Sequence, residues 1–141
     1  MHPDLEKAIK LLDEGQDTCV LCKDSNIYRS SRRGVAPLMG FLEESIDLTG
    51  FSAADKVVGK ATALLYCLLG VHAVYAHVMS KPALQVLQSH KIKTAYGQLV
   101  SAIQNRAGNG QCPMEQATAS IDDPHQALLA IRQTLKRLNS K

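Results

Sequence analysis

Apolar residues recur at helical spacing over residues 5–12, and Gly15 follows as a signal that this helix ends. Similar spacing continues along the chain. It predicts further helices over residues 35–45, 52–69, 82–90, 113–121 and 124–138. The segment 52–69 is the longest of them, and Gly70 closes it. The intervals between these helices carry a different pattern.

Four short runs rich in β-branched or buried-type residues predict strands, over residues 18–22, 26–30, 73–79 and 94–99. A three-residue turn separates the first two runs, so they are expected to pair antiparallel. A helix separates the last two, which implies a right-handed parallel crossover. The chain is therefore predicted to be one α/β domain over residues 1–141. Its expected architecture is a three-layer α/β/α arrangement around a mixed sheet of about four strands.

The composition is that of an ordinary folded domain. Of 141 residues, 45% are hydrophobic and 21% charged, which excludes disorder. The net charge is only +3 and aromatic residues make up 4%, which argues against a nucleic-acid partner. No apolar run approaches the ~20 residues that a membrane span needs, and the first residues do not resemble a signal peptide. We expect a cytoplasmic protein with no membrane partner.

The four cysteines do not suggest a metal or redox centre. Cys19 and Cys22 have CxxC spacing, but they lie on a predicted strand, where residues three apart point to opposite faces. We interpret them as buried strand cysteines rather than a redox or zinc pair. The five histidines form no HxH or HExxH pair. No metal site and no cofactor are predicted.

The most informative stretch is residues 50–60, at the start of the long predicted helix. Ser52, Asp55, Lys56 and Lys60 share one arc of that helix, whereas its second half is apolar nearly all round. Gly59 in a helix interior would cost about 1 kcal/mol relative to Ala, which suggests close approach of a backbone or a ligand.

We interpret this polar arc as a pocket wall. Asp55 would accept hydrogen bonds or act as a base, and Lys56 would hold an anion, so these two are the candidate catalytic residues. Ser52 and Lys60 are candidate ligand-binding residues. The alternative is structural: Ser52 and Asp55 fit a capping box, and the two lysines fit a solvated face.

A second candidate segment surrounds Cys112. A glycine-bearing loop over residues 105–111 leads into a helix, with Pro113 in its first turn and Glu115 at its third position. Cys112 then lies near the N-cap, where a helix dipole lowers the pKa of a thiol. Cys112, Glu115 and Arg106 are candidate ligand-binding residues at the rim of a pocket. The alternative is an ordinary loop–helix junction with a small buried cysteine.

Two other helix starts carry polar residues. Ser80 and Lys81 start a helix directly after a strand, at the place where open α/β sheets bind ligands, so both are candidate ligand-binding residues. A routine strand–helix turn would explain them equally. Asp123 and Gln126 fit a capping box for the last helix.

Residues 50–61, with the sequence GFSAADKVVGKA, and Cys112-Pro113-Met114-Glu115 downstream resemble domain-of-unknown-function family 1893. The resemblance covers roughly residues 5–132. It implies a cytidine-deaminase-like fold. Working deaminases begin one helix with His-x-Glu and the next with Pro-Cys-x-x-Cys. The matching positions here are 54–56 and 80–83, and neither carries that zinc set, so zinc-dependent deamination is not expected.

These observations lead to one preferred hypothesis and two alternatives. The preferred one is a pocket that binds a small anionic ligand, nucleotide-like or nucleobase-like, without zinc. The second is a catalytically inactive regulatory module or a homo-oligomeric assembly module. The third is thiol chemistry at Cys112.

Overall fold

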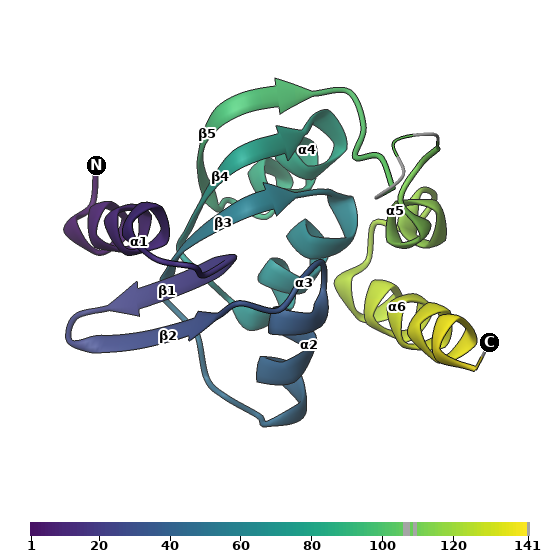
Figure 1. Ribbon diagram of the computed structural model, residues 1–141, viewed down its shortest axis with the longest axis horizontal. Coiled ribbons are helices and arrows are strands. Elements are labelled where there is room, and N and C mark those ends of the chain that lie inside the picture. The colour runs from purple at the N-terminus through teal and green to yellow at the C-terminus, as the bar shows by residue number, and fades with distance from the viewer. Residues whose placement is uncertain (106–107, 109, 141) are drawn as a thin grey trace.

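A computed structural model of the chain describes residues 1–105, 108 and 110–140. The elements follow one another along the chain as a helix, a hairpin and then alternating helices and strands (Figure 1). They are α1 (Pro3–Glu14), β1 (Cys19–Lys23), β2 (Asn26–Ser30), α2 (Ala36–Glu43), β3 (Ser52–Val58), α3 (Lys60–Leu69), β4 (Ala73–Ser80), α4 (Lys81–Ser89), β5 (Lys93–Val100), α5 (Pro113–Thr118) and α6 (Pro124–Asn139).

The strands form one mixed sheet in the order β2-β1-β3-β4-β5. Strand β1 runs antiparallel to both of its neighbours, whereas β3, β4 and β5 are parallel. The predicted hairpin and the predicted parallel crossover are both confirmed. The sheet has five strands rather than about four, because residues 52–58, which were predicted to be helical, form a strand.

The prediction of a single helix over residues 52–69 is wrong in its first half. Residues 52–58 form strand β3, Gly59 is the N-cap, and only Lys60–Leu69 is helical. The end at Gly70 is confirmed, with φ of +74° in the left-handed region. Strand β3 lies between β1 and β4, and pairing on both edges outweighs the helical spacing of its apolar residues.

Two consequences follow for the helical interpretation of this segment. Ser52 and Asp55 form no capping box, because both lie on a strand. Lys56 and Lys60 are not one turn apart on a helix, because Gly59 separates the strand from the helix. Any site at this segment is therefore built at a strand–helix junction.

Helix α1 covers one face of the sheet at β1 and β3 (Figure 1). Ala8 and Leu12 of the helix are buried against Val20, Cys22 and Ala54 of the two strands. Along each strand these residues alternate with neighbours such as Leu21 and Ala53, whose side chains point to the opposite face of the sheet.

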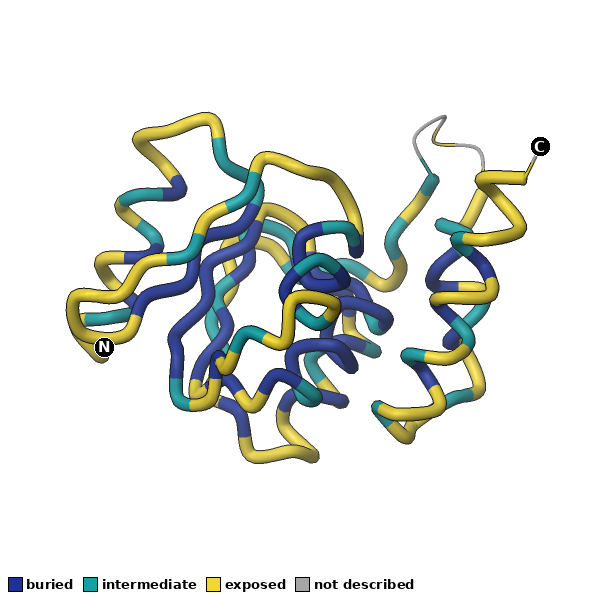
Figure 2. Tube along the Cα trace, turned by 90° about the horizontal axis from the view of Figure 1, so that it is seen from below, coloured by how far each residue is buried: buried dark blue, intermediate teal, exposed yellow. Residues whose placement is uncertain are grey.

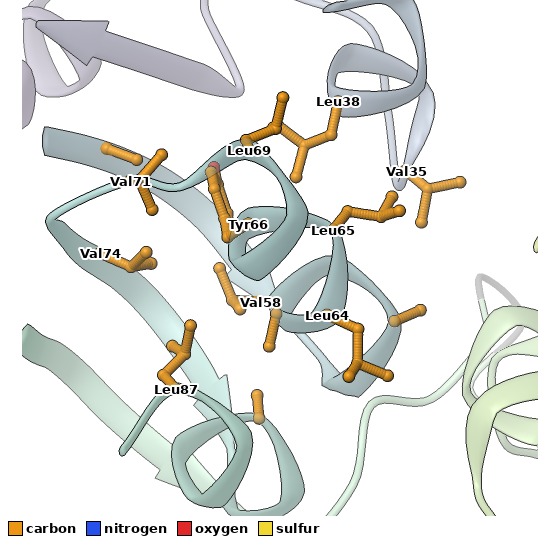
Figure 3. Packing of buried hydrophobic residues seen from close by; sticks show 14 of the residues in the cluster. Val35, Leu38, Val58, Leu64, Leu65, Tyr66, Leu69, Val71, Val74 and Leu87 are labelled. Atoms are coloured by element: carbon orange, nitrogen blue, oxygen red, sulfur yellow. The ribbon is translucent and has the colours of Figure 1, made fainter. Parts of the chain in front are cut away.

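The opposite face carries α2, α3 and α4, so the sheet has helices on both sides. Figure 3 shows Leu64 and Leu65 of α3 in this layer, with Val58 of the sheet, Leu38 of α2 and Leu87 of α4 around them. All five side chains are almost completely buried. Helix α3 is therefore enclosed by protein, in agreement with its apolar sequence.

The two cysteines of the CxxC pattern lie on these opposite faces. Cys19 belongs to the larger core with α3, and Cys22 belongs to the smaller core under α1. Both are buried free thiols. The interpretation as strand cysteines is confirmed.

Helices α5 and α6 lie beyond the carboxyl ends of the parallel strands, against α3 (Figures 1 and 2). Ala127 and Ile131 of α6 are fully buried there, while the outer face of α6 is exposed (Figure 2). The predicted cap of α6 is confirmed, since the Asp123 carboxylate accepts a hydrogen bond of 2.9 Å from the backbone N–H of Gln126. The start of α5 forms one wall of the pocket described next.

Candidate functional site

A pocket of about 330 Å³ opens at the carboxyl edge of the parallel strands. Its walls come from the end of β3, the start of α3, the loop after β2, the segment after β5 and the start of α5. Most of its surface is apolar. This is the edge at which open α/β sheets bind ligands, and the volume lies within the range of small-molecule sites.

Asp55 forms part of the pocket floor. It pairs with Cys19 across the sheet, which places its side chain on the face covered by α3. Only 8% of the residue is exposed. The hydroxyl of Tyr66 donates a hydrogen bond of 2.7 Å to Asp55 Oδ2, and the backbone N–H of Val57 donates one of 3.3 Å to Oδ1. The Cys19 thiol lies 3.3 Å from the same hydroxyl.

Burial raises the pKa of Asp55 to about 7, and it outweighs hydrogen bonding from Tyr66 and from the backbone of Val57 and Lys56, which favours the ionised form. Burial also raises the pKa of Tyr66 and that of Cys19, and the charge of Asp55 adds to both shifts. Tyr66 and Cys19 therefore keep their protons at neutral pH. Of these three hydrogen-bonded side chains, Asp55 is the one that titrates near neutral pH. Near neutrality its carboxyl group can accept or donate a proton.

Glu115 reaches from α5 to the start of α3. Its carboxylate accepts hydrogen bonds from the backbone N–H groups of Lys60 at 2.7 Å and Ala61 at 2.9 Å. These are N–H groups that a helix start leaves without partners. A Cβ on Gly59 would lie only 2.3 Å from Glu115 Oε1. A group does approach Gly59 closely, but it is the side-chain carboxylate of Glu115 rather than the backbone or ligand that was expected, and Gly59 is an N-cap rather than a position inside a helix.

Lys60 lies outside this pocket. Its ammonium group forms an ion pair of 3.1 Å with Asp122 and donates a hydrogen bond of 3.1 Å to the carbonyl of Ala119. Lys60 therefore connects the start of α3 to the segment between α5 and α6, and Glu115 connects it to α5.

The remaining candidate residues fall into two groups. The structure brings Asp55, Lys56, Cys112 and Glu115 together around the pocket. Ser52 lies at the far end of β3, where its buried hydroxyl has no hydrogen-bond partner among the described residues. Ser80 caps α4 by accepting a hydrogen bond of 3.2 Å from Ala83, and the exposed Lys81 follows it. Arg106 lies outside the described residues.

Cys112 is the N-cap residue of α5 and is half-buried in the pocket wall. The position near a helix start is as predicted. The side chain makes no capping hydrogen bond, and the first turn of α5 starts with Pro113.

Tyr66, Thr62 and Arg33 are among the polar residues of this site that sequence reasoning missed. Tyr66 was assigned to an apolar helix face, although a buried tyrosine normally needs a partner for its hydroxyl, and that requirement was the available signal. Thr62 lines the pocket with 6% of its surface exposed, and its hydroxyl forms no hydrogen bond with any described residue. Arg33 reaches the pocket from the loop after β2, and no local pattern marks it.

The charged groups of the pocket are unevenly distributed. Arg33 and Lys56 are exposed at the rim, and within the described residues neither side chain forms an ion pair. Asp55 and Glu115 are buried deeper. In the part of the chain that the structure describes, no three His, Cys, Asp or Glu side chains gather as a metal site.

Comparison with known proteins identifies the family of the chain and a similar structure. The sequence model of a domain of unknown function, DUF1893, matches residues 7–135. The chain belongs to the DUF1893 family. The match covers the motifs around Asp55 and Cys112, so the resemblance inferred from them is confirmed.

A crystal structure of a DUF1893 family protein from Thermotoga maritima is similar to this chain, with a TM-score of 0.85 and 23% sequence identity. The similarity covers 94% of this chain and 91% of the other. At that identity the likeness shows a shared fold. No curated protein matches the chain. DUF1893 is a domain of unknown function, so the family match assigns no activity to this pocket. Over the described residues, no helix is both long enough and apolar enough to cross a membrane.

Proposed function

We propose that the pocket binds a small molecule with a polar, nucleobase-like ring and an anionic group. The observation that carries the proposal is Asp55, a carboxyl group with a pKa of about 7 on the floor of a mostly apolar pocket. A buried titrating group in a concave apolar site is typical of a ligand-binding or active site.

The floor suits the polar edge of a ring. Asp55 offers an acceptor when ionised and a donor when protonated, and the unpartnered Thr62 hydroxyl lies in the same pocket. Val35, Ala61 and Met114 provide apolar surface around them. A flat heterocycle with ring N–H or amino groups fulfils both conditions, since its edge forms hydrogen bonds and its faces pack against apolar side chains.

The rim suits an anion. Lys56 and Arg33 are exposed cations without ion-pair partners among the described residues. The start of α3 is less available for this purpose, because the Glu115 carboxylate already takes two of its N–H groups. The phosphate of a nucleotide at the rim would satisfy both cations.

By analogy, the family resemblance also supports a nucleotide-like ligand. It implies a cytidine-deaminase-like fold, and a mixed sheet with helices on both faces is the architecture expected of such a protein. We assign Asp55 and Lys56 the roles of groups that act directly on the bound molecule. The free state of all four cysteines supports a reducing compartment such as the cytoplasm.

Thermal-shift and calorimetric titrations with nucleobases, nucleosides, nucleoside monophosphates and inorganic phosphate test the proposal. Lys56→Met and Arg33→Met should each weaken binding of a monophosphate about tenfold and leave the matching nucleoside unaffected, because each removes one charge-assisted hydrogen bond. Lys81→Met, an exposed lysine away from the pocket, is the matched control. Asp55→Asn should weaken the nucleobase and the nucleotide alike.

Alkylation of Cys112 gives a second readout of occupancy. A bound ligand should slow the reaction of this half-buried pocket thiol with iodoacetamide, and the rate of Cys112 in the ligand-free protein under the same conditions is the reference. Equal alkylation of Cys112 with and without every compound tested, together with no thermal shift, would contradict the proposal. A stable homo-oligomer in that case would favour the assembly module instead.

A further inference from the structure

Three polar side chains form a hydrogen-bonded chain on the other side of the sheet. Tyr75 and His77 lie two residues apart on β4, so both face α1. The Tyr75 hydroxyl lies 2.9 Å from His77 Nδ1. His77 Nε2 lies 2.9 Å from Asp13 Oδ1, near the end of α1. The imidazole therefore bridges a phenol and a carboxylate.

The carboxylate decides how the imidazole is protonated. An ionised Asp13 only accepts hydrogen bonds, so the neutral His77 ring carries its proton on Nε2 and donates it to Asp13. The Nδ1 lone pair is then directed at Tyr75, and the phenol donates to it. This is the order acid, imidazole and hydroxyl that activates a hydroxyl nucleophile.

We propose that Tyr75 is a reactive nucleophile that accepts acyl groups from activated acyl donors, with His77 as its general base and Asp13 as the group that positions His77. The phenolic oxygen forms a bond to the acyl carbon, and the bond from that carbon to the leaving group breaks. The phenolic proton passes to His77 Nδ1, and Asp13 stabilises the imidazolium that results. The product is an aryl ester on Tyr75.

The need for a base is consistent with the surroundings of the phenol. Burial and the charge of Asp13 both raise the pKa of Tyr75, so its hydroxyl keeps its proton at neutral pH. A nucleophile of this kind reacts only when a neighbouring group takes the proton as the bond forms.

The phenol and the imidazole are also both partly exposed. Tyr75 and His77 are only half-buried. On β5, Ala95 pairs with Tyr75, and Gly97 lies beside His77. A Cβ on Gly97 would lie 3.5 Å from the Tyr75 hydroxyl and 2.9 Å from the His77 carbonyl oxygen. The closer of these two contacts is with the backbone of β4, so glycine is the residue that fits beside this pair.

Acetylation by N-acetylimidazole at neutral pH, followed by peptide mapping with mass spectrometry, tests the proposal. Tyr96 on β5 is the internal control, since it is 42% exposed and no imidazole of the described residues is hydrogen-bonded to it. Tyr75 should be acetylated at least about tenfold faster than Tyr96, because a positioned general base contributes about a hundredfold or more and partial burial offsets some of it. In unfolded protein the two rates should be equal.

The variants Asp13→Asn and His77→Gln separate activation from exposure. Asp13 is exposed and His77 is half-buried, and thermal unfolding checks that each variant folds. In either variant, acetylation of Tyr75 should fall close to the rate of Tyr96, while Tyr96 itself is unchanged. Acetylation of Tyr75 no faster than Tyr96 in the wild type would overturn the proposal, as would an unchanged Tyr75 rate in folded Asp13→Asn.

Discussion

Replacing Asp55 with Asn should make the protein more stable at neutral and alkaline pH, although the residue lies in the proposed site. Burial raises the pKa of this carboxyl group from an ordinary 3.8 to about 7. Between these two values the folded protein binds a proton that the unfolded chain releases. The free energy of unfolding therefore falls as pH rises through this window.

The structure gives the size of the effect. A shift of about three pKa units, at 1.36 kcal/mol each, corresponds to about 4 kcal/mol lost by the wild type between acid and neutral pH. This figure is a ceiling, because relaxation of the folded protein around a buried charge lowers the penalty. Asn resembles the protonated carboxyl group in shape, and its carbonyl oxygen can still accept the hydrogen bond from Tyr66. It carries no charge, so this penalty disappears in the variant.

Urea unfolding of both proteins at a series of pH values measures the difference directly. Other titrating groups are common to the two proteins, so subtracting one curve from the other isolates Asp55. The advantage of Asp55→Asn should be absent near the ordinary carboxyl pKa, grow with rising pH and level off above about pH 7. A difference that stays constant over this range would refute the reasoning, because it would mean that Asp55 has the same pKa folded and unfolded.

Three further predictions concern the packing around this site. Tyr66→Phe removes a hydrogen bond that favours ionised Asp55, so the pH dependence of unfolding should move to higher pH; an unchanged midpoint would contradict that. Gly59→Ala should lower the free energy of unfolding by about 2 kcal/mol or more, because its Cβ would lie 2.3 Å from Glu115 Oε1 and displace a buried carboxylate. In a double-mutant cycle with Glu115→Ala the two losses should not add, and strict additivity would argue against the clash. Ile131→Ala should cost roughly 2–5 kcal/mol in chemical denaturation, since a fully buried side chain between α6 and α3 is lost; a loss below 1 kcal/mol, as expected for a surface position, would place α6 elsewhere.

Local signals in the sequence were sufficient for most of the elements. Apart from β3 and α3, which were predicted as one helix, the four strands and five helices occur within three residues of their predicted bounds. The stop at Gly70 and the cap at Asp123 were also predicted correctly. Each of these depends on residues close together in the chain, through backbone conformation, spacing or a short hydrogen bond.

The site was only partly predictable for the opposite reason. Asp55 and Lys56 were singled out from a segment assigned to the wrong secondary structure, since pairing with β1 and β4 decides that β3 is a strand. The direction of the Asp55 side chain, and with it the contact to Tyr66, follows from that strand register. Glu115 stood out as a polar residue near a helix start, but its position against Gly59 depends on contacts between residues more than fifty positions apart.

The sequence by itself thus determined the α/β class, the hairpin, the parallel crossover and the family, because these are written in short-range patterns and motifs. Tertiary structure alone decided which polar groups share a pocket. Arg33 and Thr62 carry no local signal and reach Asp55 only when the loop after β2, the end of β3 and the start of α3 pack together. The raised pKa of Asp55 has the same origin, since burial by residues distant in the chain is its main cause.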